Sequence, residues 1–198
     1  RRPSQWPRSV ASPRWSTLPG VTDRETLRQL IKKKAVVYGR VTLSSGAESD
    51  WYLDLRRIAL DGEAAPLVGR VMLETTADLD YDAVGGLTLG ADPVATAMLH
   101  AAAAAGRRLD AFVVRKTGKE HGLQRRIEGP DVRGRRVLAV EDTSTTGNSV
   151  LTAVVALQEA GAEVVGVGVI VERGASKAVN AAGLPYRAAF TVPELDLD

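Results

Sequence analysis

Residues 81–171 alternate short apolar runs with helical segments, and this pattern constrains the fold more than any other feature of the sequence. The runs are rich in Val and Ala and show no polar alternation, so strands formed by them are buried on both faces. Strands of that kind form parallel sheets whose connections are helices, which predicts an open, mainly parallel α/β sheet flanked by helices. We expect strands at 82–87, 111–114, 137–140 and 164–171, and helices at 93–105 and 149–160.

The segment before this sheet predicts a helix, a hairpin and a second helix. Thr22 and Glu25 have the spacing of a capping box, so a helix should run from there to about residue 36. A hairpin is expected between 41–43 and 51–55, and a helix at 62–77. Residues 1–20 contain four Pro and no periodicity, and we interpret them as a disordered or non-native N-terminal extension.

Composition excludes several classes of site. The chain has no Cys and only two His, which argues against disulfide scaffolds, zinc sites and thiol nucleophiles. Any metal should therefore be a hard ion held by oxygen. No apolar run is long enough to span a bilayer, so we expect a soluble, cytoplasmic protein. The basic residues gather in 1–40 and 107–136, which indicates an anionic partner, either phosphate or nucleic acid.

The most informative segment follows the strand expected at 137–140. Ligands of open α/β sheets bind beyond the carboxyl ends of the strands, and a helix N-terminus in a Thr- and Gly-rich turn offers N–H groups to a phosphate. The two acids before the turn suit neutral sugar hydroxyls, so together they indicate a phosphorylated sugar with a diol. The alternative is that Ser149 only caps the helix and the acids bind a cation. The segment comprises Glu141, Asp142, Thr143, Ser144, Thr145, Thr146, Gly147, Asn148 and Ser149.

Two further segments should lie at the same edge of the sheet. GGLTLG at 85–90 offers a second glycine-bearing turn, and RKTGKEHG at 115–122 opens a long connection of the kind that forms lids. The cations of this arm would balance charge on a polyanionic leaving group. Two anion sites, a diol clamp and a cationic arm fit a ribose that carries a 5-phosphate and a 1-diphosphate.

VLAVEDTSTTGNS resembles the phosphoribosyl diphosphate signature of the type I phosphoribosyltransferases. With RKTGKEHG, GRVTLSSG and a late VERG, the chain is similar to the orotate phosphoribosyltransferases, in particular the actinobacterial ones, from about Val21 to its C-terminus. The resemblance implies the type I phosphoribosyltransferase fold, with a domain at 21–198. A small hood subdomain would comprise about 21–60 plus the C-terminal end, and the core about 62–175.

The resemblance also implies an activity and its partners. Orotate and 5-phosphoribosyl 1-diphosphate would be converted to orotidine 5′-phosphate and diphosphate in pyrimidine biosynthesis. Mg²⁺ would be the cofactor, held by substrate oxygens without a direct protein ligand. The enzyme would be a homodimer with shared active sites, in which the charged arm reaches the neighbouring subunit. We expect no nucleic-acid or membrane partner.

Roles for individual residues follow from the same resemblance. Glu141 and catalytic Asp142 would hold the ribose hydroxyls, while residues 143–149 bind the 5-phosphate. Thr145 and Arg173 would bind orotate, with Arg173 pairing with its carboxylate. The diphosphate would be contacted by the arm, in which Lys119 is the main catalytic cation; its residues are Arg115, Lys116, Lys119 and His121.

The sequence departs from the family's pattern at Ser44 and Leu89, where many relatives have Lys. The turn at 88–90 would then bind anions through its backbone, while Trp51 and Tyr52 either wall the base or pack in the interior. Two alternatives stay open: a phosphoribosyltransferase for another base, or a non-enzymatic nucleotide-sensing regulator that binds nucleic acid. The arm and Arg173 favour the orotate enzyme over both.

Overall fold

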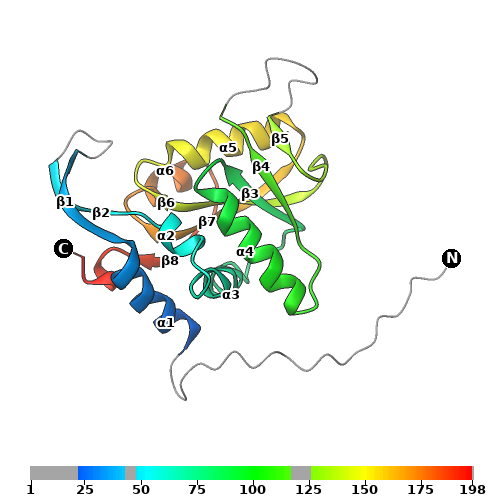
Figure 1. Ribbon diagram of the computed structural model, residues 1–198. Helices are drawn as coiled ribbons and strands as arrows, with labels where there is room; N and C mark the ends of the chain where they lie inside the picture. Colours follow the sequence, from blue (N-terminus) through cyan, green and yellow to red (C-terminus); the bar gives the residue numbers. More distant parts are fainter. Residues whose placement is uncertain (1–21, 43–47, 117–125, 198) are drawn as a thin grey trace.

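The structure is a computed structural model that describes residues 22–42, 48–116 and 126–197. Its centre is a six-stranded sheet in the order β5-β4-β3-β6-β7-β8 (Figure 1). Neighbouring strands are parallel except for β4 and β5, which confirms the mainly parallel sheet expected from the apolar runs. The strands are β3 (Ala83–Leu87), β4 (Asp110–Val114), β5 (Ile127–Glu128), β6 (Arg136–Ser144), β7 (Glu163–Glu172) and β8 (Tyr186–Thr191).

Helices cover both faces of this sheet. In β6, Leu138 and Val140 pack into one apolar cluster with α3 and α4, whereas Val137 and Ala139 pack into a second cluster with α5. All four side chains are fully buried. Burial on both faces explains why the strand shows no polar alternation in the sequence. The helices are α3 (Ala65–Thr75), α4 (Ala91–Ala104), α5 (Asn148–Glu159) and α6 (Ser176–Ala181).

The N-terminal region forms a helix and a separate two-stranded hairpin that projects from the sheet (Figure 1). The expected cap is present, because the Glu25 amide donates to Thr22 Oγ1 at 3.2 Å. The first helix ends earlier than expected, at Leu30, and continues as one turn of π-helix. The hairpin strands begin earlier as well. The elements are α1 (Asp23–Leu30), η1 (Ile31–Ala35), β1 (Val36–Thr42), β2 (Glu48–Leu53) and α2 (Arg56–Ala59).

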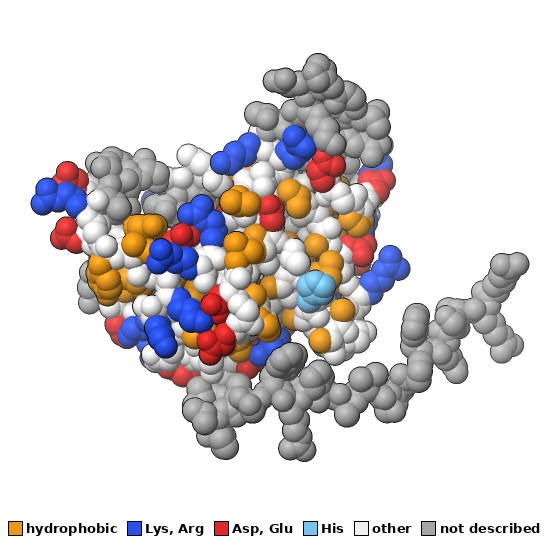
Figure 2. Space-filling view, viewed as in Figure 1, with side chains coloured by type: hydrophobic (Ala, Val, Ile, Leu, Met, Phe, Trp, Pro, Cys, Tyr) orange, Lys and Arg blue, Asp and Glu red, His pale blue; other side chains and the backbone are white. Residues whose placement is uncertain are grey.

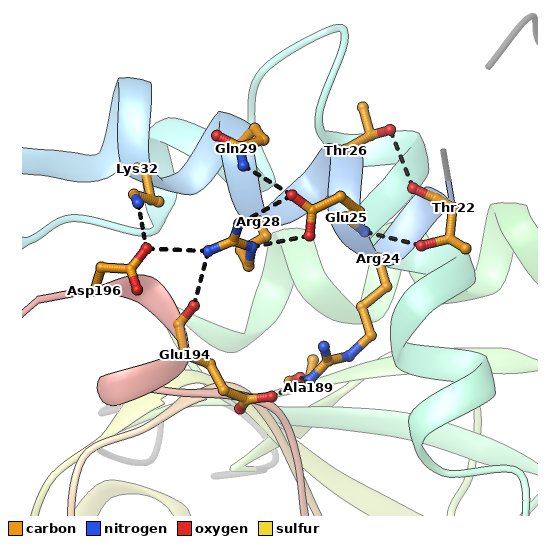
Figure 3. Close-up of polar contacts among 10 residues, drawn as sticks. All are labelled: Thr22, Arg24, Glu25, Thr26, Arg28, Gln29, Lys32, Ala189, Glu194 and Asp196. Carbon is orange, nitrogen blue, oxygen red and sulfur yellow. Dashed lines mark hydrogen bonds and ion pairs between the residues drawn. The ribbon is translucent and has the colours of Figure 1, made fainter. Parts of the chain in front are cut away.

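A cluster of charged contacts joins α1 to the C-terminal segment (Figure 3). Arg24 donates to Ala189 O at 2.6 Å and pairs with Glu194 at 2.7 Å, and its guanidinium lies 4.6 Å from the centre of the Phe190 ring. Arg28 pairs with Asp196 at 3.2 Å. Residues far apart in the sequence therefore lie side by side, around the short helix η2 (Pro193–Leu195).

Five elements are absent from the sequence-based expectation, namely α2, β5, α6, β8 and η2. β5 has two residues, and α6 and β8 lie beyond residue 175, where we expected the core to end. β8 is an edge strand in which only Ala189 and Phe190 are buried, so it lacks the apolar run that marks the inner strands. Within the described ranges, no helix combines the length and the apolar character that crossing a bilayer requires.

Candidate active site

Glu141 and Asp142 lie inside β6, because this strand continues past Val140, where we expected it to end. Its pairing with β7 includes Glu141 with Val169, and continues to the last residue of the strand, Ser144. The Thr143 side chain reinforces the pairing by donating to Val171 O at 3.1 Å. The expected loop at 143–149 is therefore shorter, since its first two residues belong to the strand.

Residues 145–147 form the turn between β6 and α5. Gly147 has φ 83°, a left-handed conformation that favours glycine, and it occupies the N-cap position of α5. Ser149 is within the helix, so the interpretation of Ser149 as a helix cap is wrong. Thr145, Thr146 and Asn148 are exposed. The N-terminal N–H groups of α5 thus lie beside exposed hydroxyl groups, as a phosphate site requires.

The acid pair is enclosed rather than solvated. Glu141 is 6% exposed and Asp142 is half-buried. Burial, followed by the adjacent Asp142 carboxylate, raises the pKa of Glu141 to about 8. Burial also raises the pKa of Asp142. The Thr143 amide, which donates to Asp142 Oδ1 at 2.7 Å, partly offsets this rise. A protonated Glu141 beside Asp142 offers both a donor and an acceptor, which suits the two hydroxyls of a diol.

The turn after β3 lies directly against this pair. A Cβ atom built on Gly90 would stand 2.3 Å from Glu141 Oε1 and 2.8 Å from Asp142 Oδ1, so a side chain there would require both carboxylates to move. Next to Gly90, the Thr88–Leu89 peptide bond is cis. The Thr88 hydroxyl donates to Asp92 at 2.7 Å. The structure thus brings together the two turns that the sequence predicts as anion sites.

Arg173 lies at the carboxyl end of the neighbouring strand β7. Its amide donates to Ser144 O at 3.1 Å, and its guanidinium lies 5.8 Å from the centre of the Trp51 ring of β2. A Cβ atom on the next residue, Gly174, would lie 3.1 Å from Thr145 O. The two residues predicted to bind a base, Thr145 and Arg173, are therefore neighbours, and Trp51 stands beside them.

The charged arm is only partly described. Arg115 continues the ladder between β4 and β5, because its amide donates to Arg126 O at 2.7 Å, and its side chain pairs with Glu128 at 3.3 Å. Lys116 is exposed. The remaining predicted residues of the arm, Lys119 and His121, lie outside the described residues, as does Ser44 of the hairpin.

Arg56 is a residue near the acids that sequence reasoning missed. It pairs with Asp54 at 2.8 Å, and its charge opposes the rise in the pKa of Asp142. The only signal in the sequence is an acid and an Arg two residues apart after the hairpin. That pattern is too common to single out a site residue.

A groove of about 960 Å³ lies between α3 and α4. It is mostly apolar, and Figure 2 shows hydrophobic side chains gathered on this face between charged ones. Leu89 and Asp92 connect it to the turn after β3. Leu60 and Leu89, which line the groove, are 71% and 61% exposed. The acids and the turn at 145–147 do not line this groove.

Comparisons with known proteins identify the family of the chain. A family model of the phosphoribosyl transferase domain matches residues 74–183. The orotate phosphoribosyltransferase of Streptomyces avermitilis is 71% identical over 178 residues, which cover 88% of this chain and 98% of the relative. That of Corynebacterium glutamicum is 59% identical over 180 residues, covering 90% and 96%.

A solved structure gives the same result. The orotate phosphoribosyltransferase of Mycobacterium tuberculosis H37Rv in complex with 5-phospho-alpha-D-ribosyl 1-diphosphate is 54% identical, with a TM-score of 0.77. The match covers 89% of this chain and all of that one. Fold, site geometry and identity over most of the sequence thus converge. The chain belongs to the phosphoribosyltransferase family and, within it, to the orotate phosphoribosyltransferases.

Proposed function

We propose that this chain transfers a 5-phosphoribosyl group from 5-phosphoribosyl 1-diphosphate to orotate, in pyrimidine biosynthesis, giving orotidine 5′-phosphate and diphosphate. One observation carries the proposal: the two turns predicted to bind anions meet at the acid pair, where a Cβ atom on Gly90 would come within 2.8 Å of both carboxylates. A ribose with phosphate groups at both ends fits between them. The relatives' names support orotate as the acceptor.

The reaction needs little covalent chemistry from the protein. As the bond to the diphosphate breaks, positive charge develops on the ribose ring, and the base then attacks the same carbon. The turn at 145–147 holds the 5-phosphate, and the pair Glu141 and Asp142 holds the ribose hydroxyls. Arg173 donates to the orotate carboxylate while Trp51 lies along the base. Fixing both reactants in this way removes most of the entropic cost of bringing them together.

Mg²⁺ fits this site as a substrate-bound ion. Among the described residues, no group of three or more His, Cys, Asp or Glu side chains is arranged to hold a metal. Mg²⁺ would be held by oxygens of the diphosphate and the ribose, without a direct protein ligand, while Glu141 and Asp142 bind the ribose hydroxyls. When bound, the ion neutralises charge on the diphosphate. Arg115, Lys116, Lys119 and His121 contribute the remaining positive charge, with Lys119 acting on the leaving group.

A homodimer with shared active sites completes the proposal. The exposed groove with Leu60 and Leu89 supports it, because a second copy would cover this apolar surface next to the turn at 88–90. Mixing two inactive variants, Lys119→Ala and Asp142→Asn, tests the sharing. If the arm of one subunit serves the other, each mixed dimer regains one intact site, and about a quarter of the activity returns on random exchange. If each subunit uses its own arm, no activity returns.

The activity itself is tested by a Mg²⁺-dependent assay that follows the loss of orotate absorbance. Uracil, adenine, hypoxanthine and guanine serve as competing acceptors. We expect turnover of orotate alone, and no change in activity or in RNA binding when residues 1–20 are removed. Turnover of a purine without orotate would contradict the assigned base and leave the fold unchanged.

A further inference from the structure

The turn that carries Arg173 is held by its neighbour Glu172. Glu172 is the last residue of β7, where it pairs with Ser144 of β6 and Thr191 of β8. Its Oε1 atom accepts two backbone hydrogen bonds, from Gly174 N at 2.9 Å and from Ser176 N at 3.1 Å. One carboxylate oxygen therefore holds the backbone of the residues that follow Arg173.

The other oxygen of the same carboxylate is enclosed. In the described part of the chain, Glu172 Oε2 and Tyr186 Oη are both buried and neither has a hydrogen-bond partner. Burial, followed by the Glu172 carboxylate, raises the pKa of Tyr186, which places the phenol and the carboxylate close together. Tyr186 packs against the apolar cluster that contains Val169 and Val179. The Glu172 side chain is thus fixed from two directions.

This arrangement leaves the Arg173 guanidinium available to a ligand. A carboxylate next to an Arg would ordinarily compete for its charge, but here one carboxylate oxygen is occupied by the turn and the other is enclosed near the phenol. Arg173 instead faces Trp51. Its amide, at the same time, donates to Ser144 O, which ties the turn to the end of β6.

From these contacts we propose that Glu172 is a positioning residue for the base pocket, which holds the turn at 172–176 so that Arg173 is directed at the carboxylate of the base. The inference rests on the proposed function, because it requires Arg173 to bind orotate. Glu172 acts only through Arg173 and contacts no substrate. Its effect should therefore disappear when the guanidinium is absent.

The test is a double-mutant cycle on the full chain, with steady-state KM values for both substrates. Glu172→Ala should raise the KM for orotate by about tenfold and leave that for 5-phosphoribosyl 1-diphosphate within about twofold. Glu172→Gln should restore most of the orotate affinity, because an amide oxygen still accepts both N–H groups. Combined with Arg173→Ala, Glu172→Ala should add nothing further.

Control variants distinguish a failure of this inference from a failure of the proposed role of Arg173. Glu163→Gln, at the exposed start of the same strand, should change neither KM. If Arg173→Ala leaves the KM for orotate unchanged, the proposed role of Arg173 fails and this inference fails with it. If Arg173→Ala raises that KM but Glu172→Ala changes both KM values alike, or adds fully to Arg173→Ala, only the inference is overturned, and Glu172 stabilises the fold alone.

Discussion

Gly90, in the turn after β3, and Glu141, in β6, are 51 residues apart in the sequence, yet a Cβ atom on Gly90 would stand 2.3 Å from Glu141 Oε1. If Glu141 and Asp142 hold the ribose, as we propose, Gly90 is part of the sugar site without contributing a side chain. Gly90→Ala should displace the acid pair and lower kcat/KM for 5-phosphoribosyl 1-diphosphate by at least about tenfold, the range that overpacking predicts. Steady-state kinetics would measure the loss.

Gly62 provides the matched control for this substitution. A Cβ atom on Gly62 would meet no atom within 4 Å, so Gly62→Ala should leave the kinetics unchanged. Equal activities for the two alanine variants would show that the acids can move aside, and that the close approach of Gly90 to them does not affect activity.

The buried Glu141 carboxyl predicts a pH dependence of stability. Because its pKa in the folded chain is raised from 4.5 to about 8, the folded state holds a proton that the unfolded state has lost over that interval. The free energy of unfolding should therefore fall as the pH rises from about 4.5 to 8, by something on the order of a few kcal/mol. Glu141→Gln should remove this dependence and be relatively more stable at pH 8.5 than at pH 6.

Denaturant unfolding at the two pH values measures this difference. Glu159 is exposed on α5 and gives the control. Glu159→Gln should change the free energy of unfolding by the same amount at pH 6 and at pH 8.5. A Glu141→Gln variant whose stability follows the unsubstituted protein at every pH would show that Glu141 is ionised in the folded state.

Lys119→Ala tests the assignment of the charged arm. If Lys119 stabilises the departing diphosphate, its charge matters more in the transition state than in the bound substrate. We expect kcat to fall by about 10²- to 10³-fold with a smaller change in KM. Lys33→Ala, at an exposed position of η1, is the control. An unchanged kcat in the Lys119 variant would refute the role.

The contacts between α1 and the C-terminal segment predict a modest effect on stability. Arg24 pairs with Glu194, donates to Ala189 O and covers the Phe190 ring, although its side chain is 46% exposed. Surface ion pairs contribute little, so we expect Arg24→Ala to lower the free energy of unfolding by only about 1 kcal/mol, mainly through the ring contact. Arg57→Ala, a similarly exposed Arg, should lower it less. Thermal unfolding would rank the two, and equal losses would contradict the role of the ring.

Much of the fold was predictable because its inner strands are buried on both faces. Val137 and Leu138 point to opposite faces of the sheet, and both are apolar, so the run is visible in the sequence. The edge strand β8 was missed because its half-exposed residues carry no such signal. β6 was predicted too short, since Thr143 looks like a loop residue until its pairing with β7 is known.

The candidate site likewise has one part that the sequence predicts and one part that it does not. The acids and the Thr-rich turn are contiguous in the sequence, and their spacing next to a buried strand was sufficient to find them. Arg56 is distant in the sequence from Asp142, whose pKa its charge affects. Glu172 is adjacent to Arg173, but the bonds that its carboxylate accepts from the amides of Gly174 and Ser176 become visible only in the structure. Only the folded chain brings those groups together, so spacing could not reveal them.

The central claim is that the turn at 145–147 holds the phosphate of a phosphorylated ribose. Amide chemical shifts measured by NMR during titration with ribose 5-phosphate test it most directly. The account predicts that the largest chemical-shift changes occur at the amides of residues 145–149, and that ribose without phosphate leaves the shifts of these amides unchanged. Chemical-shift changes confined to the groove between α3 and α4, with no change at the amides of residues 145–149, would contradict the claim.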